Sequence, residues 1–263
     1  MRVGRAIITI FVTGILLTGI IATTGCAHRY YADDLKPLGE GEQGEHRTVL
    51  DDGSVVLEKD RLEITVRPMS VDELNRQFNA NTQVGTNPYT WGSSTVFRTD
   101  ETPERFTVFR VSVKNYEFPK VHLTPTDAYI TSSNGRKYYA LSYHQLWTYY
   151  RSYATGGKGG DTGDTGAERQ GARRGNELNE WSARSDLLKR TMYPDDLVFS
   201  GQEQEGFLVF RPLDTDVSTI TIHIPDVAIR FDYRGEPVEV IDVTAQFDRE
   251  IGKVYPDGTR EPM

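Results

Sequence analysis

Apolar and polar side chains alternate along several short stretches of this chain, as they do in β-strands with one buried face. In the clearest stretch, Phe109, Val111 and Val113 alternate with polar neighbours, whereas Phe106 and Val108 have the opposite phase. A change of phase within one strand predicts a β-bulge near Val108. The same alternation predicts a core formed by Phe109, Val111, Val113, Ile220, Ile222, Ile229 and Phe231.

The strand pattern also predicts the domain organisation. About nine such strands, separated by turn dipeptides such as Asn134-Gly135, occur between residues 51 and 250, a spacing typical of an antiparallel β-sandwich. A second phase shift lies at Val240-Ile241. Residues 26–50 are polar and without apolar periodicity, which predicts a flexible tether, and residues 251–263 are expected to be a C-terminal tail.

Helical spacing replaces the strand pattern in two places. A capping box at Ser70 predicts a short helix over residues 71–78. The second place is an insertion over residues 142–195, where Tyr143, Leu146, Trp147 and Tyr150 have the spacing of one helix face, and where a second helix is expected over residues 176–192. Between these helices, residues 155–175 hold eight glycines and no large apolar side chain, which predicts a mobile segment.

Three segments in the strand region carry a family resemblance. These segments are Phe106-Thr-Val-Phe-Arg-Val-Ser-Val-Lys-Asn115, Pro125-Thr-Asp-Ala-Tyr-Ile-Thr-Ser-Ser-Asn-Gly-Arg-Lys-Tyr138 and Ser200-Gly-Gln-Glu-Gln-Glu-Gly-Phe-Leu-Val-Phe-Arg-Pro212. They are similar to the immunoglobulin-like (telokin-like) domains that occur outside the cytoplasm in bacterial lipoproteins. The resemblance implies an immunoglobulin-like sandwich with a helical, glycine-rich insertion, and it implies no catalytic residue.

The first residues have the layout of an export signal. Arg2 and Arg5 precede an uncharged apolar run over residues 6–22, and small residues follow up to Gly25-Cys26. This end resembles the lipobox of bacterial lipoproteins, which implies a signal peptide over residues 1–25 and a lipidated Cys26. Because Ala27 is not Asp, the resemblance implies the outer membrane, facing the periplasm, with an inner-membrane anchor as the alternative. From the residues alone, an uncleaved transmembrane helix is a further alternative.

Composition narrows the classes of partner. Cys26 is the only cysteine, and a lone thiol suits an oxidising compartment best when it is lipidated. The formal net charge of −8 becomes −10 once Arg2 and Arg5 are removed, and an acidic chain repels nucleic acid. We therefore expect contact with the membrane through the N-terminal lipid and an envelope protein as partner.

The sequence contains no recognisable catalytic or cofactor motif. The five histidines lack metal-ligand spacing, and acidic pairs such as Asp214 and Asp216 fall in predicted turns. We therefore expect no catalytic residue, no metal and no cofactor. The best candidate for a binding site is the aromatic helix, because Tyr and Trp are frequent at binding hot spots. Its candidate residues are Tyr143, Trp147, Tyr150 and Tyr153.

These features leave three hypotheses for function. The first is a membrane-tethered, non-catalytic binding or assembly module. The second is a carbohydrate-binding module that uses exposed coplanar rings on the aromatic helix. The third is a hydrolase whose carboxylates meet only in the folded chain. The aromatic side chains are also suited to a purely structural role, packing against the helix over residues 176–192.

Overall fold

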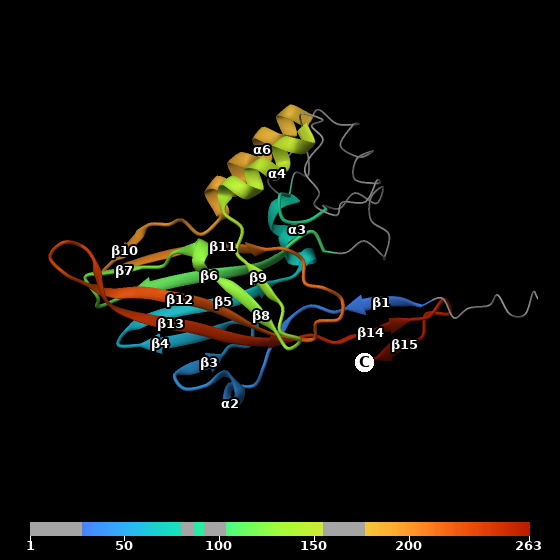
Figure 1. The fold of residues 1–263 in the computed structure, drawn as a ribbon, viewed down its shortest axis with the longest axis horizontal. Coiled ribbons are helices and arrows are strands. Elements are labelled where there is room, and N and C mark those ends of the chain that lie inside the picture. The colour runs from blue at the N-terminus through green and yellow to red at the C-terminus, as the bar shows by residue number, and fades with distance from the viewer. Residues whose placement is uncertain (1–27, 80–86, 92–103, 155–176) are drawn as a thin grey trace, which may run out of the picture. The chain divides into compact units, whose positions relative to one another are not determined.

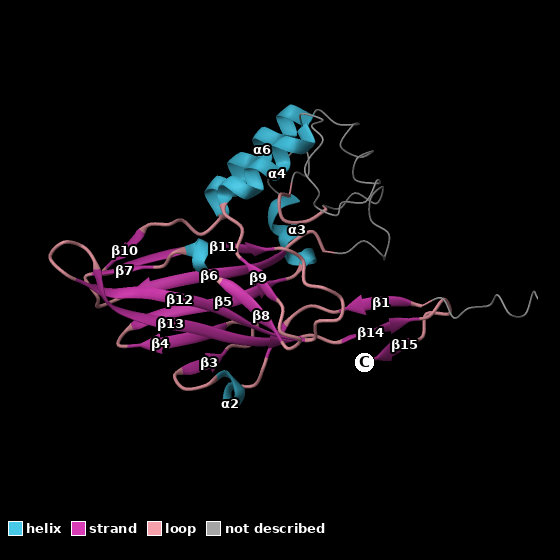
Figure 2. Ribbon diagram, viewed as in Figure 1, coloured by secondary structure: helices cyan, strands magenta, loops and turns pink. Residues whose placement is uncertain are grey.

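The computed structural model describes residues 28–79, 87–91, 104–154 and 177–263 (Figures 1 and 2). The described chain forms two compact units, of which the larger is Asp33–Arg249 and the smaller joins the residues up to Ala32 with Glu250–Met263. Within the described residues, no helix is long and apolar enough to cross a membrane.

The larger unit contains two antiparallel sheets (Figure 2). The first sheet has five strands in the order β11-β6-β5-β4-β3. These strands are β3 (Arg47–Val49), β4 (Val55–Lys59), β5 (Leu62–Met69), β6 (Thr107–Asn115) and β11 (Gln202–Phe210).

The second sheet has seven strands around the long β12–β13 hairpin. Its main order is β10-β7-β12-β13-β2, while β8 pairs with β12 and with β9. These strands are β2 (Lys36–Pro37), β7 (Lys120–His122), β8 (Tyr129–Ser132), β9 (Lys137–Tyr139), β10 (Leu197–Phe199), β12 (Thr219–Phe231) and β13 (Pro237–Asp248). The fold is thus the all-β antiparallel sandwich that the sequence predicts.

Apolar side chains from the facing sides of the two sheets form the main core. Phe109 of β6 lies 5.3 Å from Phe247 of β13, measured between ring centroids. Of the seven predicted core residues, six are buried in this cluster: Phe109, Val111, Val113, Ile220, Ile222 and Ile229. The strand pattern identifies them because each sheet buries one complete face here.

Phe231 is the exception among the predicted core residues. The pairing of β12 with β13 shifts between Ile224 and Val227, and again next to Phe231. These irregularities interrupt the alternation. Phe231 is therefore half-buried, and its ring lies under the ammonium group of Lys120, 4.1 Å from the nitrogen. The register shift at Ile224 lies opposite residues 241–243, so the predicted phase shift at Val240-Ile241 marks a real irregularity.

The opposite face of the five-stranded sheet holds a second core, and this corrects the prediction of a bulge near Val108. The pairing of β6 with both neighbours continues without a shift through residues 108–110. Val108 is buried on the outer face, whereas Phe109 is buried between the sheets. The apparent change of phase therefore arises because both faces of the strand are covered at this end.

Helices and one short segment cover this outer face. The helices α3 (Val71–Asn79), α4 (Tyr143–Ala154) and α6 (Glu177–Thr191) agree with the three predicted helices. Figure 1 shows α4 and α6 side by side. We call α3, residues 87–91, α4 and α6 the helical cap. Its core with the sheet consists of Met69, Leu74, Phe78, Tyr89, Phe106, Val108, Leu146, Tyr150, Leu188, Phe207 and Val209.

The predicted flexible tether over residues 26–50 is wrong: residues 29–32 form a strand of the smaller unit, and further elements lie within residues 33–49. These elements are β2, the short helix α2 (Glu40–Gln43) and β3. The Gln43 side chain donates to the carbonyl of Gln246 at 2.7 Å and accepts from its amide at 2.9 Å. Arg47 Nε donates to the carbonyl of Thr244 at 2.7 Å. Together with the Leu38 amide, which also donates to the Gln246 carbonyl, these side chains bond the backbone of β13 beyond its pairing with β2 and cover that edge of the strand.

The predicted C-terminal tail is wrong as well. Residues 250–263 belong to the smaller unit, a three-stranded antiparallel sheet in the order β1-β14-β15. Its strands are β1 (Arg29–Ala32), β14 (Ile251–Val254) and β15 (Arg260–Pro262). In the larger unit, a short 3-10 helix (Pro125–Asp127) precedes β8.

Candidate binding surface

Helix α4 is positioned by its sequence at both its start and its buried face. The Ser142 hydroxyl accepts the Gln145 amide at 3.2 Å, and the Gln145 side chain accepts the Ser142 amide at 2.8 Å. This reciprocal cap fixes the first turn. On the helix that follows, Leu146 and Tyr150 lie on the face that packs into the cap core, and both are buried. The Tyr150 hydroxyl donates to the backbone carbonyl of Pro88.

Trp147 lies beside this buried stripe and remains half-exposed. Its ring centroid is 5.6 Å from that of Trp181 on α6, at an interplanar angle of 65°. The His144 ring stacks on Trp147 at 5.8 Å and 15°. The Arg151 guanidinium lies 4.9 Å from the Trp147 ring centroid. We call His144, Trp147, Arg151 and Trp181 the Trp147 surface; it combines aromatic faces with a cation at the solvent boundary.

A hydrogen bond holds the two helices in register at this surface. The Tyr143 hydroxyl lies 2.9 Å from the hydroxyl of Ser185 on α6. Leu188, one turn further along α6, is fully buried. The predicted docking of the two helices is therefore confirmed. They cover the outer face of the five-stranded sheet.

Arg105 forms a second aromatic cluster under the same helix. Its guanidinium carbon lies 4.4 Å from the Trp91 ring, 4.8 Å from Tyr150 and 5.4 Å from Tyr149. A guanidinium between several rings is attracted to each of them, more strongly when water is excluded. The cluster ties residues 87–91 to α4.

A buried polar network fixes residues 87–91 against α3. The Asn87 side chain donates to the Asn75 side-chain oxygen at 3.0 Å, and the Thr90 hydroxyl donates to the same oxygen at 2.5 Å. Tyr89 is buried, and burial raises the pKa of its phenol. The signal in the sequence that could have identified this segment as packed is the presence of two aromatic residues, Tyr89 and Trp91, among polar ones.

The four predicted binding residues have different positions in the structure. Tyr143 is 36% exposed and Trp147 is half-exposed, so both are accessible. Tyr150 is 2% exposed and belongs to the cap core, so it does not form part of a contact surface. Tyr153 lies in α4, but its side chain is outside the described residues, as is Cys26. Arg151 and Trp181 join the candidate surface, although sequence reasoning assigned neither of them to it.

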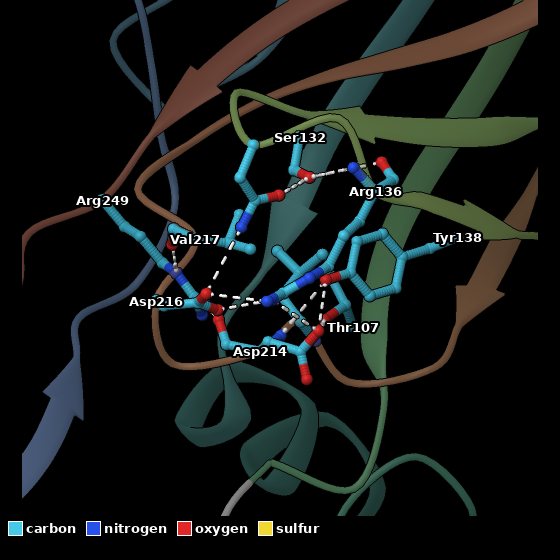
Figure 3. Close-up of polar contacts among 10 residues, drawn as sticks. Thr107, Ser132, Arg136, Tyr138, Asp214, Asp216, Val217 and Arg249 are labelled. Atoms are coloured by element: carbon cyan, nitrogen blue, oxygen red, sulfur yellow. Dashed lines mark hydrogen bonds and ion pairs between the residues drawn. The ribbon is translucent and has the colours of Figure 1, made fainter.

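The carboxylates of Asp214 and Asp216 meet at a single arginine (Figure 3). Arg136 Nη1 donates to Asp214 at 2.9 Å and to Asp216 at 2.5 Å, and its Nη2 donates to Asp216 at 2.8 Å. The hydrogen bonds from Arg136 lower the pKa of Asp216. Tyr138 donates to Asp214 at 2.8 Å.

Arg249 anchors the same loop from its other side. Its Nε donates to the carbonyl of Val217 at 2.8 Å and its Nη2 to the carbonyl of Asp214 at 2.7 Å (Figure 3). Burial lowers the pKa of Arg249. A general acid needs a raised pKa, whereas the pKa of Asp216 is lowered. The geometry is that of a clamp between a loop and the β8–β9 hairpin.

The other polar clusters are weaker candidates for a binding site than the Trp147 surface. A groove of about 650 Å³ beside the β4–β5 turn is lined by His46, Arg47, Lys59 and Arg61 together with Glu58, Asp60 and Glu63, so it favours neither sign of charge. His223 stacks on Tyr129 at 4.6 Å and bonds Thr131 at 2.9 Å. Among the described residues, no three His, Cys, Asp or Glu side chains are grouped as metal ligands.

Comparison with known proteins adds one weak structural similarity. No protein-family model matches this chain, and no curated protein matches it in sequence. Among solved structures, it is similar to a secreted protein from Mycobacterium tuberculosis, MPT63, with a TM-score of 0.28 and 6% identity, over 68% of this chain and 90% of that one. A similarity at this level carries no argument about function.

Proposed function

We propose that this chain is a membrane-tethered envelope lipoprotein that acts as a non-catalytic binding or assembly module, with the Trp147 surface as its contact region. The observation that supports this is the position of Trp147. Its neighbours Leu146 and Tyr150 are buried, whereas the indole stays at the solvent boundary between His144 and Arg151. Trp, Tyr and Arg are the residues that most often dominate binding energy.

The envelope location in this proposal rests on the N-terminal sequence. The apolar run before Gly25-Cys26 and the absence of any other cysteine support lipidation at Cys26. Ala27 supports sorting to the outer membrane, facing the periplasm, with the inner membrane as the alternative. An envelope protein is the proposed partner.

The two alternative functions receive less support from the geometry. A sugar platform needs exposed coplanar rings, but Trp147 and Trp181 lie at 65° to each other. At the Trp147 surface, His144 and Trp147 are nearly parallel, but they stack on each other, so each ring covers part of the other's face. The carboxylates of Asp214 and Asp216 are held by Arg136, an arrangement that supports a structural clamp.

Capture from native envelopes with a matched control tests the contact region. The full-length chain, Trp147→Ala and Tyr139→Ala are each cross-linked in membranes and purified. Tyr139 is 62% exposed on β9, outside the helical cap, so its variant controls for loss of an exposed ring. We expect Trp147→Ala to lose one specific co-purifying protein that Tyr139→Ala retains. Equal recovery with both variants would remove the Trp147 surface from the proposal.

Metabolic labelling tests the anchor separately. A clickable palmitate should label the full-length chain and should not label Cys26→Ser. Cell fractionation should then place the labelled chain with the outer membrane. Labelling of both forms would show that Cys26 is not the lipidated residue.

A further inference from the structure

The smaller unit begins almost at the proposed lipid. Only Ala27 lies between Cys26 and His28, and the two α-carbons, which are two peptide units apart, are separated by at most about 7 Å. The described chain enters β1 at Arg29. A lipid on Cys26 would therefore hold the start of β1 at the membrane surface, with no room for a long tether.

The pairing of β1 decides which end of the small sheet this is. β1 runs antiparallel to β14, and Arg29 pairs with Val254 (Figure 1). Beyond that pair, the His28 ring lies 6.3 Å from the ring of Tyr255, the first residue after β14. The turn between β14 and β15 therefore lies at the same end of the sheet as the anchor. We call His28, Arg29, Tyr30 and residues 255–260 the anchor-side tip.

The anchor-side tip has the composition of a membrane interface. Tyr30 is 53% exposed, and its ring lies 5.2 Å from that of His28 in an edge-on contact. Arg260 is exposed and lies 4.8 Å over the ring of Tyr31. Tyrosine rings concentrate where hydrocarbon meets headgroups, and arginine keeps its charge in water while its stem lies on apolar surface.

The net charge of the small unit also permits it to approach an anionic lipid surface. After Cys26, the small unit carries three basic side chains and three acidic ones, whereas the whole chain after Cys26 has a net charge of −10. The small unit therefore lacks the acidic excess that would repel an anionic lipid surface. Asp257 is exposed at the tip, and hydrogen bonds from Thr259 lower its pKa.

We propose that the anchor-side tip rests in the headgroup region of a phospholipid bilayer, so that the small sheet itself contacts the membrane. This inference relies on the lipid that the proposed function places on Cys26. It adds a second contact with the bilayer, through Tyr30, Tyr255 and Arg260.

Site-specific fluorescence on the full-length, lipidated chain tests this contact. A lipidated Cys26 does not react with thiol reagents, so one introduced cysteine takes a single environment-sensitive NBD label. Thr259→Cys places the label at the anchor-side tip. Met263→Cys is the matched control, because Met263 is 58% exposed and its amide bonds Ile251, at the opposite end of the same sheet. The chains are reconstituted into phosphatidylethanolamine–phosphatidylglycerol vesicles that carry a nitroxide-labelled lipid near the headgroup.

We expect the label at residue 259 to shift to the blue and to be quenched several-fold more strongly than the label at residue 263. Adding Tyr30→Ser and Tyr255→Ser should reduce this difference. Equal quenching at the two positions in a chain whose intact mass shows the acyl groups would overturn the inference and leave the anchor standing. An intact mass without acyl groups would overturn the anchor itself, and with it the basis for membrane contact.

Discussion

Strand β6 borders two apolar cores, one on each face, and the two are built in different ways. The core between the sheets is assembled from alternating residues of long strands, including Phe109, Ile222 and Phe247. The cap core joins one sheet face to three helices and residues 87–91, and it includes buried polar groups such as Asn75. The first core therefore depends on strand alternation, whereas the second depends on segments that have to be brought together by the fold.

The difference shows where binding capacity resides in this molecule. Side chains in the core between the sheets have no access to solvent. The helical cap buries one stripe of α4 and leaves the adjacent ring of Trp147 half-exposed. Because the core between the sheets does not include the helical cap, side chains of the cap such as Trp147 can face solvent without weakening that core.

The largest expected effect comes from a charge placed between the sheets. Val111 is fully buried in that core. Val111→Asp should lower the free energy of unfolding by more than about 4 kcal/mol, because it buries an unpaired carboxylate. Chemical denaturation followed by far-UV circular dichroism measures this loss. A Val111→Asp chain that unfolds at the parent's denaturant concentration would contradict the assignment of this core.

A cavity in the cap core should have a smaller and more local effect. Leu188 is fully buried between α6 and the sheet. Leu188→Ala should cost about 2–4 kcal/mol in the stability of the cap. Hydrogen exchange should accelerate in α4 and α6 and stay slow in β12 and β13. Equal acceleration in both regions would mean that the two cores unfold as one cooperative unit.

Truncation of the half-exposed Trp147 side chain should lower the stability less than Leu188→Ala does. Trp147→Ala removes the contacts with Trp181, His144 and Arg151, and we expect a loss of about 1–2 kcal/mol. Thermal melting measures the loss, with Tyr139→Ala as the control for an exposed ring. A loss as large as that of Leu188→Ala would show that Trp147 serves packing rather than contact.

The smallest effect is expected from the glycine-rich segment between α4 and α6. Residues 155–175 lie outside the described residues, so their mobility remains a prediction from composition. Replacing them with a short Gly-Ser linker should leave the melting temperature nearly unchanged, because loop-closure entropy depends weakly on length. A marked drop in melting temperature would indicate that this segment contributes to the cap.

Several features of the fold were predictable because they depend on local periodicity. Ile220 and Ile222 alternate with polar neighbours, and both lie between the sheets as predicted. The three helices of the cap follow from helical spacing, and the first also follows from the cap at Ser70, whose hydroxyl accepts the Glu73 amide at 3.2 Å. Each of these signals is contained in a few consecutive residues.

Other predictions failed because the deciding partner is distant in the chain. The phase change at Val108 suggested a bulge, since sequence alone does not reveal that helices cover the outer face. Residues 33–49 looked like a tether because short edge strands need little apolar surface and take their hydrogen bonds from β13. The same limit applies to the candidate site, where Arg105 joins Trp91 to α4.

The sequence by itself determined that strands alternate into a sandwich, that an aromatic helical insertion interrupts it, and that Cys26 stands alone after an apolar run. Only the tertiary structure decided that Tyr150 is buried while Trp147 reaches solvent, and that the two ends of the described chain pair in one small sheet. Periodicity reports which residues share a face. What covers that face depends on segments far away in the sequence, whose packing sets the free energy of each burial.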